Sequence, residues 1–244
     1  MTIFALDSLD LAALLCSRVC HDVISPVGAI VNGLEVLEEE KDGEMRQFAL
    51  DLIKKSAHTA SARLQFCRLA FGAAGSAGAS IDTGDAEKVT RGLIDAGKTT
   101  LNWNAPRVLM AKNKVKLLLN LCLIASAAVP RGGVIDVTVT GDGEDVVLRV
   151  AAKGINARVA HGVAALLAGS PATDSVDAHG IQAFYTGMVA RASHMSVAIS
   201  VEGELVTIDA TPMRAVAEAV PALDAVLAPA ADIAPAQTQH AAAL

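Results

Sequence analysis

A long helical repeat of apolar residues opens the chain and restricts its fold more than any other feature. Between residues 8 and 40, apolar side chains recur every three or four positions, as on one face of an α-helix. Ser8 is a candidate cap for this helix. A second repeat covers about 44–72, and Lys41-Asp42-Gly43 separates the two. The pattern predicts an antiparallel helical hairpin over residues 1–72.

This hairpin carries more apolar surface than two helices can bury against each other. We therefore expect a homodimer in which two hairpins form a four-helix bundle. Packing of the same surface against other parts of the chain is the alternative.

The rest of the chain is organised differently. Small residues from Gly72 to Ser80 indicate a linker, placed at 73–82, and the Ala- and Pro-rich end, 213–244, predicts a weakly ordered tail. Residues 83–212 alternate between two patterns, with helices expected at 85–97, 111–128, 157–168 and 177–192 and strands at 99–103, 134–140, 145–151, 195–201 and 204–210. This order predicts an α/β sandwich, and the whole chain is expected to be an α+β protein.

Charge and hydropathy exclude several classes of protein. The formal net charge of -6 argues against binding to nucleic acid, which needs clustered Lys and Arg. The N-terminal residues lack the basic and apolar regions of a secretory signal. The longest apolar stretch, Leu117–Val129, is shorter than the ~20 residues that span a bilayer. We expect a cytoplasmic protein that binds neither nucleic acid nor membrane.

Two cysteines, Cys16 and Cys20, lie one helical turn apart and close to His21. Cysteines within apolar helical patterns usually act as small core residues. No second Cys/His pair completes a set of four ligands. No metal site is therefore expected, and a metal-binding helix is a remote alternative.

The chemical signal in the first helix is the run His21-Asp22-Val23-Ile24-Ser25-Pro26. Because an α-helix advances about 100° per residue, His21 lies opposite the apolar stripe and is expected to face solvent. Imidazole is a nucleophile near neutral pH, and Asp22 can orient it or assist proton movement. Pro26 removes a backbone donor and is expected to kink the helix.

The neighbours of His21 on its helix face are candidates for contact with another protein. Arg18, Ser25 and Gly28 lie on that face, and the two small residues leave room for close approach. An exposed His on a helix is usually only a solvated residue, so a chemical role for His21 needs support from the surrounding motif and from residues later in the chain.

The run His-Asp-x-x-Ser-Pro resembles the H-box of histidine-kinase dimerisation domains, and the hairpin and linker are similar as well. Those kinases carry an ATP-binding domain after the linker. Its Asn-x-x-x-Asn-Ala box is similar to residues 120–125, where Asn120 matches the first Asn but Ile124 replaces the metal-coordinating one. In the Asp-x-Gly-x-Gly box, Ala152 replaces the Asp that contacts adenine, while Gly154 matches the first Gly. Gly180 stands in the region of the later phosphate-binding glycines, with one of the pair lost.

These replacements remove the chemistry of nucleotide binding. Carbon at position 124 cannot coordinate Mg²⁺, and Ala152 has no carboxylate for adenine. Without paired glycines, backbone amides cannot wrap phosphates closely. We expect the fold to be kept and ATP not to be used.

A histidine-bearing hairpin joined to such a domain is similar to the ChpT-type histidine phosphotransferases of alphaproteobacterial cell-cycle relays, over roughly residues 8–210. The resemblance implies a homodimer whose His21 accepts phosphate from the receiver domain of a CckA-type hybrid kinase. It also implies transfer to response regulators of the CtrA and CpdR types. No cofactor is expected on this chain, because the receiver's own Mg²⁺ stabilises the transferring group.

Two alternatives from other classes stay open at this point. One is an active ATP-dependent sensor histidine kinase, against which Ile124 and Ala152 argue. The other is a dimer that only binds receiver domains. It predicts stable binding that replacement of His21 does not change.

Overall fold

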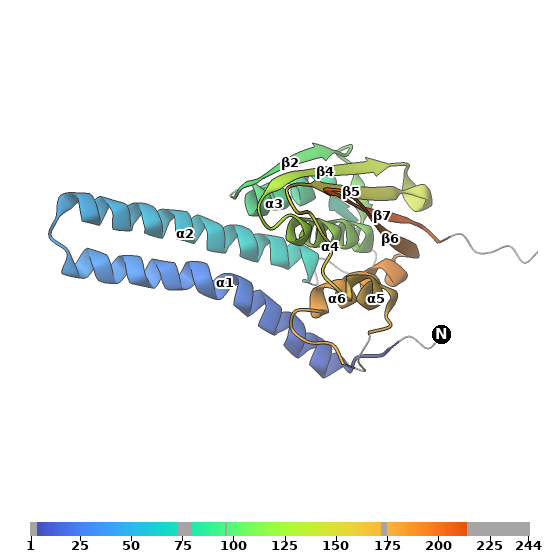
Figure 1. Ribbon diagram of the computed structural model, residues 1–244, viewed down its shortest axis with the longest axis horizontal. Coiled ribbons are helices and arrows are strands. Elements are labelled where there is room, and N and C mark those ends of the chain that lie inside the picture. The colour runs from blue at the N-terminus through green and yellow to red at the C-terminus, as the bar shows by residue number, and fades with distance from the viewer. Residues whose placement is uncertain (1–3, 73–79, 96, 172–174, 214–244) are drawn as a thin grey trace, which may run out of the picture. The chain divides into compact units, whose positions relative to one another are not determined.

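The chain begins with a hairpin of two long helices, as the apolar repeats predict. The computed structural model describes residues 4–72, 80–95, 97–171 and 175–213. Helix α1 (Ser8–Glu39) and helix α2 (Gly43–Ala70) run side by side (Figure 1). Asp7, rather than the expected Ser8, caps α1, because its carboxylate accepts a hydrogen bond of 2.8 Å from the Leu9 amide.

The second part is a five-stranded sheet with helices on one face (Figure 1). Its strands, in spatial order, are β2 (Thr99–Asn104), β4 (Gly133–Thr140), β5 (Val147–Lys153), β7 (Leu205–Pro212) and β6 (Met195–Glu202). Only the β2–β4 pair is parallel. The helices are α3 (Thr83–Ile94), α4 (Lys112–Ala128), α5 (Val163–Ala168) and α6 (Ile181–Ala192). Two short strands, β1 (Ser80–Asp82) and β3 (Leu109–Ala111), pair separately, and a 3₁₀ turn covers Gly143–Asp145. The predicted mixed α+β fold is confirmed.

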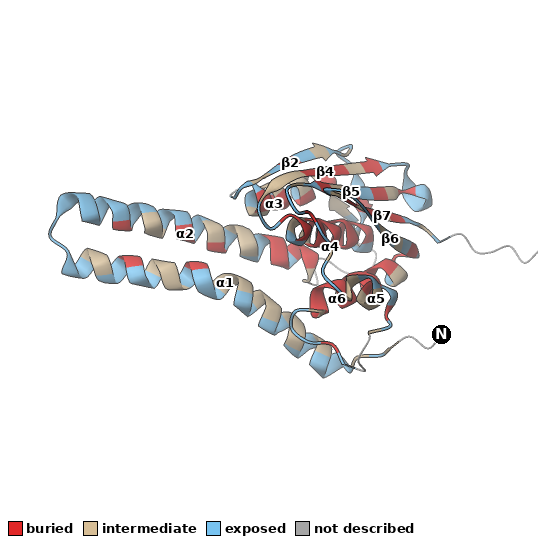
Figure 2. Cartoon of the chain, in the orientation of Figure 1, coloured by how far each residue is buried: buried red, intermediate tan, exposed pale blue. Residues whose placement is uncertain are grey.

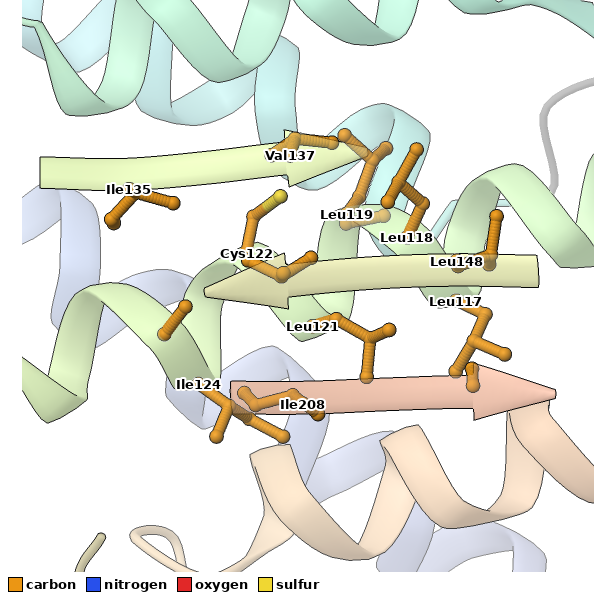
Figure 3. Close-up of a cluster of buried hydrophobic side chains, with 14 of the residues drawn as sticks. Leu117, Leu118, Leu119, Leu121, Cys122, Ile124, Ile135, Val137, Leu148 and Ile208 are labelled. Carbon is orange, nitrogen blue, oxygen red and sulfur yellow. The ribbon is translucent and has the colours of Figure 1, made fainter. Parts of the chain in front are cut away.

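Helix α4 is the centre of the core. It is buried around most of its circumference, whereas the distal half of the hairpin is largely exposed (Figure 2). Leucines of α4 pack against apolar side chains of the central strands, such as Ile135, Leu148 and Ile208 (Figure 3). The opposite face of the sheet is polar, with the Arg149–Asp209 ion pair at 2.6 Å. One apolar face and one polar face are typical of a sheet with helices on one side.

The hairpin is anchored to the sheet domain at two places. The end of α2 enters the main core through Phe66, Leu69 and Ala70. The residues before α1 and its first turns form a smaller cluster with α6. In this cluster the rings of Phe4 and Phe184 pack edge to face, with their centroids 5.9 Å apart. Both helices of the hairpin are therefore fixed against the sheet domain.

Several boundaries differ from the predicted ones. Helix α5 covers only the end of the expected helix 157–168, because Gly162, at φ +86, starts it. Residues 178–180 form a turn before α6, since the Asp177 carboxylate accepts the amides of His179 and Gly180. Residues 80–82 of the expected linker form β1, a strand too short to show a sequence period. The rest of that linker, 73–79, and the expected tail beyond residue 213 lie outside the described residues.

Helix α1 is the one helix among the described residues that is long and apolar enough to cross a membrane. The longest apolar stretch identified in the sequence, Leu117–Val129, lies elsewhere, so the length and apolar character of α1 were not singled out. It is weak support for a membrane span, because apolar helices of soluble proteins pass the same test of length and composition. Helix α1 also carries the Arg18–Asp22 ion pair near its middle and packs against α2.

Candidate functional site

His21 projects from the middle of α1 with 79% of its side chain exposed. Its Nδ1 lies 3.6 Å from an Asp22 carboxylate oxygen, which is beyond hydrogen-bonding distance. The other carboxylate oxygen accepts a bond of 3.0 Å from Arg18 Nε, one turn earlier on the helix. Arg18 thus fixes the Asp22 carboxylate close to an imidazole that solvent and a partner can reach.

Pro26 lies on the next turn of α1, five residues after His21, and is buried. The expected kink does not end the helix, which continues through Pro26 to Glu39. Pro26 has no amide hydrogen, so the main-chain oxygen of Asp22, four residues earlier, lacks its intrahelical donor. Arg63 of α2 donates to that oxygen instead.

Arg63 is the functional candidate that the sequence motifs did not reveal. It lies 41 residues from Asp22, so no local motif connects the two. The available signal was indirect: a proline inside a helix frees a carbonyl group that needs a donor from elsewhere.

A cavity of about 430 Å³ opens beside His21, between the hairpin and helices α3 and α4. Its polar lining comes from the hairpin: Arg18, His21, Asp22, Ser25 and Arg63. Its apolar lining includes Phe66, Phe71, Leu93 and Leu123. The structure therefore brings together four of the predicted site residues, and the predicted docking residue Gly28 is not part of the lining.

Cys67 also lines this cavity but is not a competing nucleophile. Burial raises the pKa of its thiol to about 11, and the Asp22 charge contributes to the rise, while Arg18 and Arg63 act against the shift. The thiol is protonated at neutral pH and weakly nucleophilic. His21, the predicted nucleophile, lines the same cavity and is exposed.

Asn120, the retained residue of the predicted nucleotide box, is fully buried and serves the packing of three helices. Its amide nitrogen donates to the main-chain oxygens of Ala70 at 3.1 Å and Lys116 at 2.8 Å. Its oxygen accepts a bond of 2.7 Å from Gln182 Nε2 of α6. Asn120 thus connects the end of α2 with α4 and α6.

The other predicted box residues lie in closely packed surroundings. Ile124 lines a cavity of only about 150 Å³, together with Arg158, His179 and Gln182. Ala152 is fully buried within β5. At Gly154 a Cβ atom would lie 2.5 Å from the Gly132 carbonyl oxygen, and at Gly180 it would lie 3.0 Å from Leu166. Close packing therefore accounts for glycine at both positions.

An exposed apolar surface runs along the hairpin. On α1 it includes Ile24, Val27, Val31 and Leu34, and on α2 it includes Met45, Phe48 and Leu64. It continues into an apolar groove of about 520 Å³ between the two helices, lined in part by Leu15, Cys16, Cys20 and Leu64. Within the described residues, no three His, Cys, Asp or Glu side chains are grouped so that they could hold a metal ion.

Known proteins resemble this chain over most of its length. Protein phosphotransferase ChpT of Brucella abortus (strain 2308) is 49% identical over 199 residues, which are 82% of this chain and 94% of the relative. A solved bacterial phosphotransferase is 45% identical and superposes with a TM-score of 0.79, over 86% of this chain and all of that one. The model of the histidine phosphotransferase C-terminal domain matches residues 83–205. The chain therefore belongs to the histidine phosphotransferase family.

Proposed function

We propose that this chain relays phosphoryl groups between receiver domains through His21. The observation that carries the proposal is the exposed imidazole at the mouth of a cavity, beside a carboxylate fixed by Arg18. The family to which the chain belongs supports the same chemistry.

In the proposed reaction, a ring nitrogen of His21 attacks the phosphorus atom of a receiver's aspartyl phosphate in line. The nitrogen–phosphorus bond forms as the bond to the aspartyl oxygen breaks, and the receiver regains its carboxylate. A second receiver's aspartate then attacks phosphohistidine and regenerates the imidazole. Nδ1 faces Asp22, so Nε2 is the nitrogen presented to the receiver. The receiver's Mg²⁺ and Lys stabilise the charge of the transferring phosphoryl group, and this chain positions the imidazole that attacks it.

The chain performs this transfer without ATP. The cavity at Ile124, about 150 Å³, is smaller than the ~300–1,000 Å³ of ordinary ligand pockets. Asn120 is occupied by three buried hydrogen bonds. Both observations support the loss of nucleotide binding that Ile124 and Ala152 indicate.

The functional protein is a cytoplasmic homodimer whose hairpins form a four-helix bundle. The exposed apolar stripe on α1 and α2 supports this, because a patch of that kind on a soluble protein marks an interface. The family resemblance supports a CckA-type receiver as the donor and CtrA-type and CpdR-type regulators as acceptors.

The decisive test is a labelling assay with wild type, His21→Ala and a matched control, His161→Ala, which removes another exposed imidazole. Each protein receives either labelled ATP or a phosphorylated receiver freed of ATP. We expect wild type and the control to take label from the receiver only, and His21→Ala to take none. Label taken from ATP would contradict the proposal, as would stable receiver binding without any phosphohistidine.

The dimer is tested by replacing Val31, an exposed apolar residue of α1, with glutamate. Wild type is expected to elute in light-scattering chromatography at twice the 25.0 kDa chain mass, and Val31→Glu as a monomer, because a buried unpaired charge is costly. Val201→Glu places the same charge at a similarly exposed position on β6 and should leave the mass unchanged. A monomeric wild type would exclude the bundle.

A further inference from the structure

The turn of α1 that carries His21 lacks one of the hydrogen bonds that keep a helix rigid. In an uninterrupted helix, the amide of residue 26 would donate to the oxygen of Asp22. Pro26 has no such amide, and its ring also crowds that oxygen. The unpaired carbonyl group belongs to the residue directly after the proposed phospho-acceptor.

Arg63 supplies the missing donor from the facing helix. Its Nη1 donates to the Asp22 main-chain oxygen, and its side chain is half-buried and lines the cavity beside His21. Arg63 makes no ion pair with an acidic side chain of the described residues. Asp22 is therefore held twice, at its carboxylate by Arg18 and at its main chain by Arg63.

We propose that Arg63 is a positioning residue for phosphoryl transfer, which replaces the amide that Pro26 lacks and fixes the turn bearing His21 and Asp22. The inference rests on the proposed function of His21. A guanidinium suits the task, because a charged donor bonds a carbonyl oxygen more strongly than a neutral one. The rate of transfer depends on this fixation, since a displacement of about 1 Å at a reacting group costs roughly 10²-fold in rate.

The test compares loss of Arg63 in two backgrounds. Arg63→Met is expected to lower the maximal rate of label transfer from a saturating phosphorylated receiver about tenfold or more. Pro26→Ala restores an amide hydrogen for the Asp22 oxygen, so that Arg63→Met in this background should lose less than about threefold. Lys54→Met, which removes an exposed cation from the same helix, is the matched control and should transfer at the wild-type rate.

The two backgrounds separate positioning from other roles of Arg63. A tenfold loss that persists with Pro26→Ala would overturn the inference, because Arg63 would then act on the phosphoryl group or the receiver. Wild-type transfer by Arg63→Met would overturn it as well. Helical circular dichroism confirms that each variant is folded, and Arg63→Lys, which keeps a donor, should recover part of the rate. Failure of wild type to take label at His21 would refute the proposed function itself.

Discussion

At the scale of single residues, Asn120 is a fully buried polar side chain that forms hydrogen bonds with three partners. Asn120→Ala removes the side-chain donor to the Ala70 oxygen and leaves the Gln182 amide nitrogen with only a longer bond of 3.4 Å to Thr186 Oγ1. We expect it to lower the free energy of unfolding by about 2–4 kcal/mol. Urea titration at fixed protein concentration measures this loss. Asn102→Ala breaks an exposed bond to Asp136 and should cost less than about 0.5 kcal/mol. A loss below about 1 kcal/mol at Asn120 would contradict its packing role.

The buried thiols give a second prediction at this scale. Burial raises the pKa of Cys67 to about 11 and that of Cys122 to about 12, so both stay protonated and shielded at pH 8. In a chain with Cys16→Ser and Cys20→Ser, a thiol reagent should label neither cysteine while the protein is folded. Both should react in denaturant, where the unfolded thiols ionise near pH ~8.5. Rapid labelling of Cys122 in the folded protein would show that the core around α4 opens.

Whether a site residue could be predicted depended on how far it lies along the chain from the residues it contacts. His21, Asp22, Arg18 and Ser25 lie within eight positions, and helical periodicity places them on adjoining faces. Arg63 was out of reach, because its bond to Asp22 depends on how two helices are aligned. Asn120 was identified by its motif, but its bond to α6 spans 62 residues and could be seen only in three dimensions.

At the scale of elements, replacing either of two glycines of α1 by alanine is expected to have opposite effects on stability. A Cβ at Gly33 would lie 2.7 Å from Ile53 Cγ1 and 3.3 Å from the Ala49 oxygen, whereas one at Gly28 would meet nothing within 4 Å. Gly33→Ala should destabilise the hairpin by about 1–3 kcal/mol. Gly28→Ala should stabilise it by about 0.5–1 kcal/mol, because alanine restricts the unfolded chain. Urea titrations of the two variants check the pair, and equal effects would contradict the close approach at Gly33.

The elements were predicted well where a sequence period is long and poorly where a single residue sets the boundary. Both hairpin helices and the five strands of the main sheet follow their periods closely. The late starts of α5 and α6 depend instead on Gly162 and on the side chain of Asp177. A strand of three residues, such as β1, has no period to detect.

At the scale of the whole molecule, the contacts of α2 with the main core and of α1 with α6 predict one cooperative unit for residues 4–213. The single tryptophan, Trp103, lies in β2, while most of the helical signal comes from α1 and α2. Unfolding followed by Trp103 fluorescence and by helical circular dichroism should therefore give the same midpoint. Loss of helix at a lower denaturant concentration would show that the hairpin unfolds separately.

The burial of Asn120 and Ala152 also makes the proposed loss of nucleotide use hard to reverse in evolution. A carboxylate at position 152 would enter a fully enclosed site with no ligand to pair with it, and each early step would cost stability. Asn120 has meanwhile become part of the scaffold between α2 and α6, so moving it toward a ligand would break that scaffold. Packing therefore opposes the return of nucleotide binding, because the substitutions that would restore it first destabilise the fold.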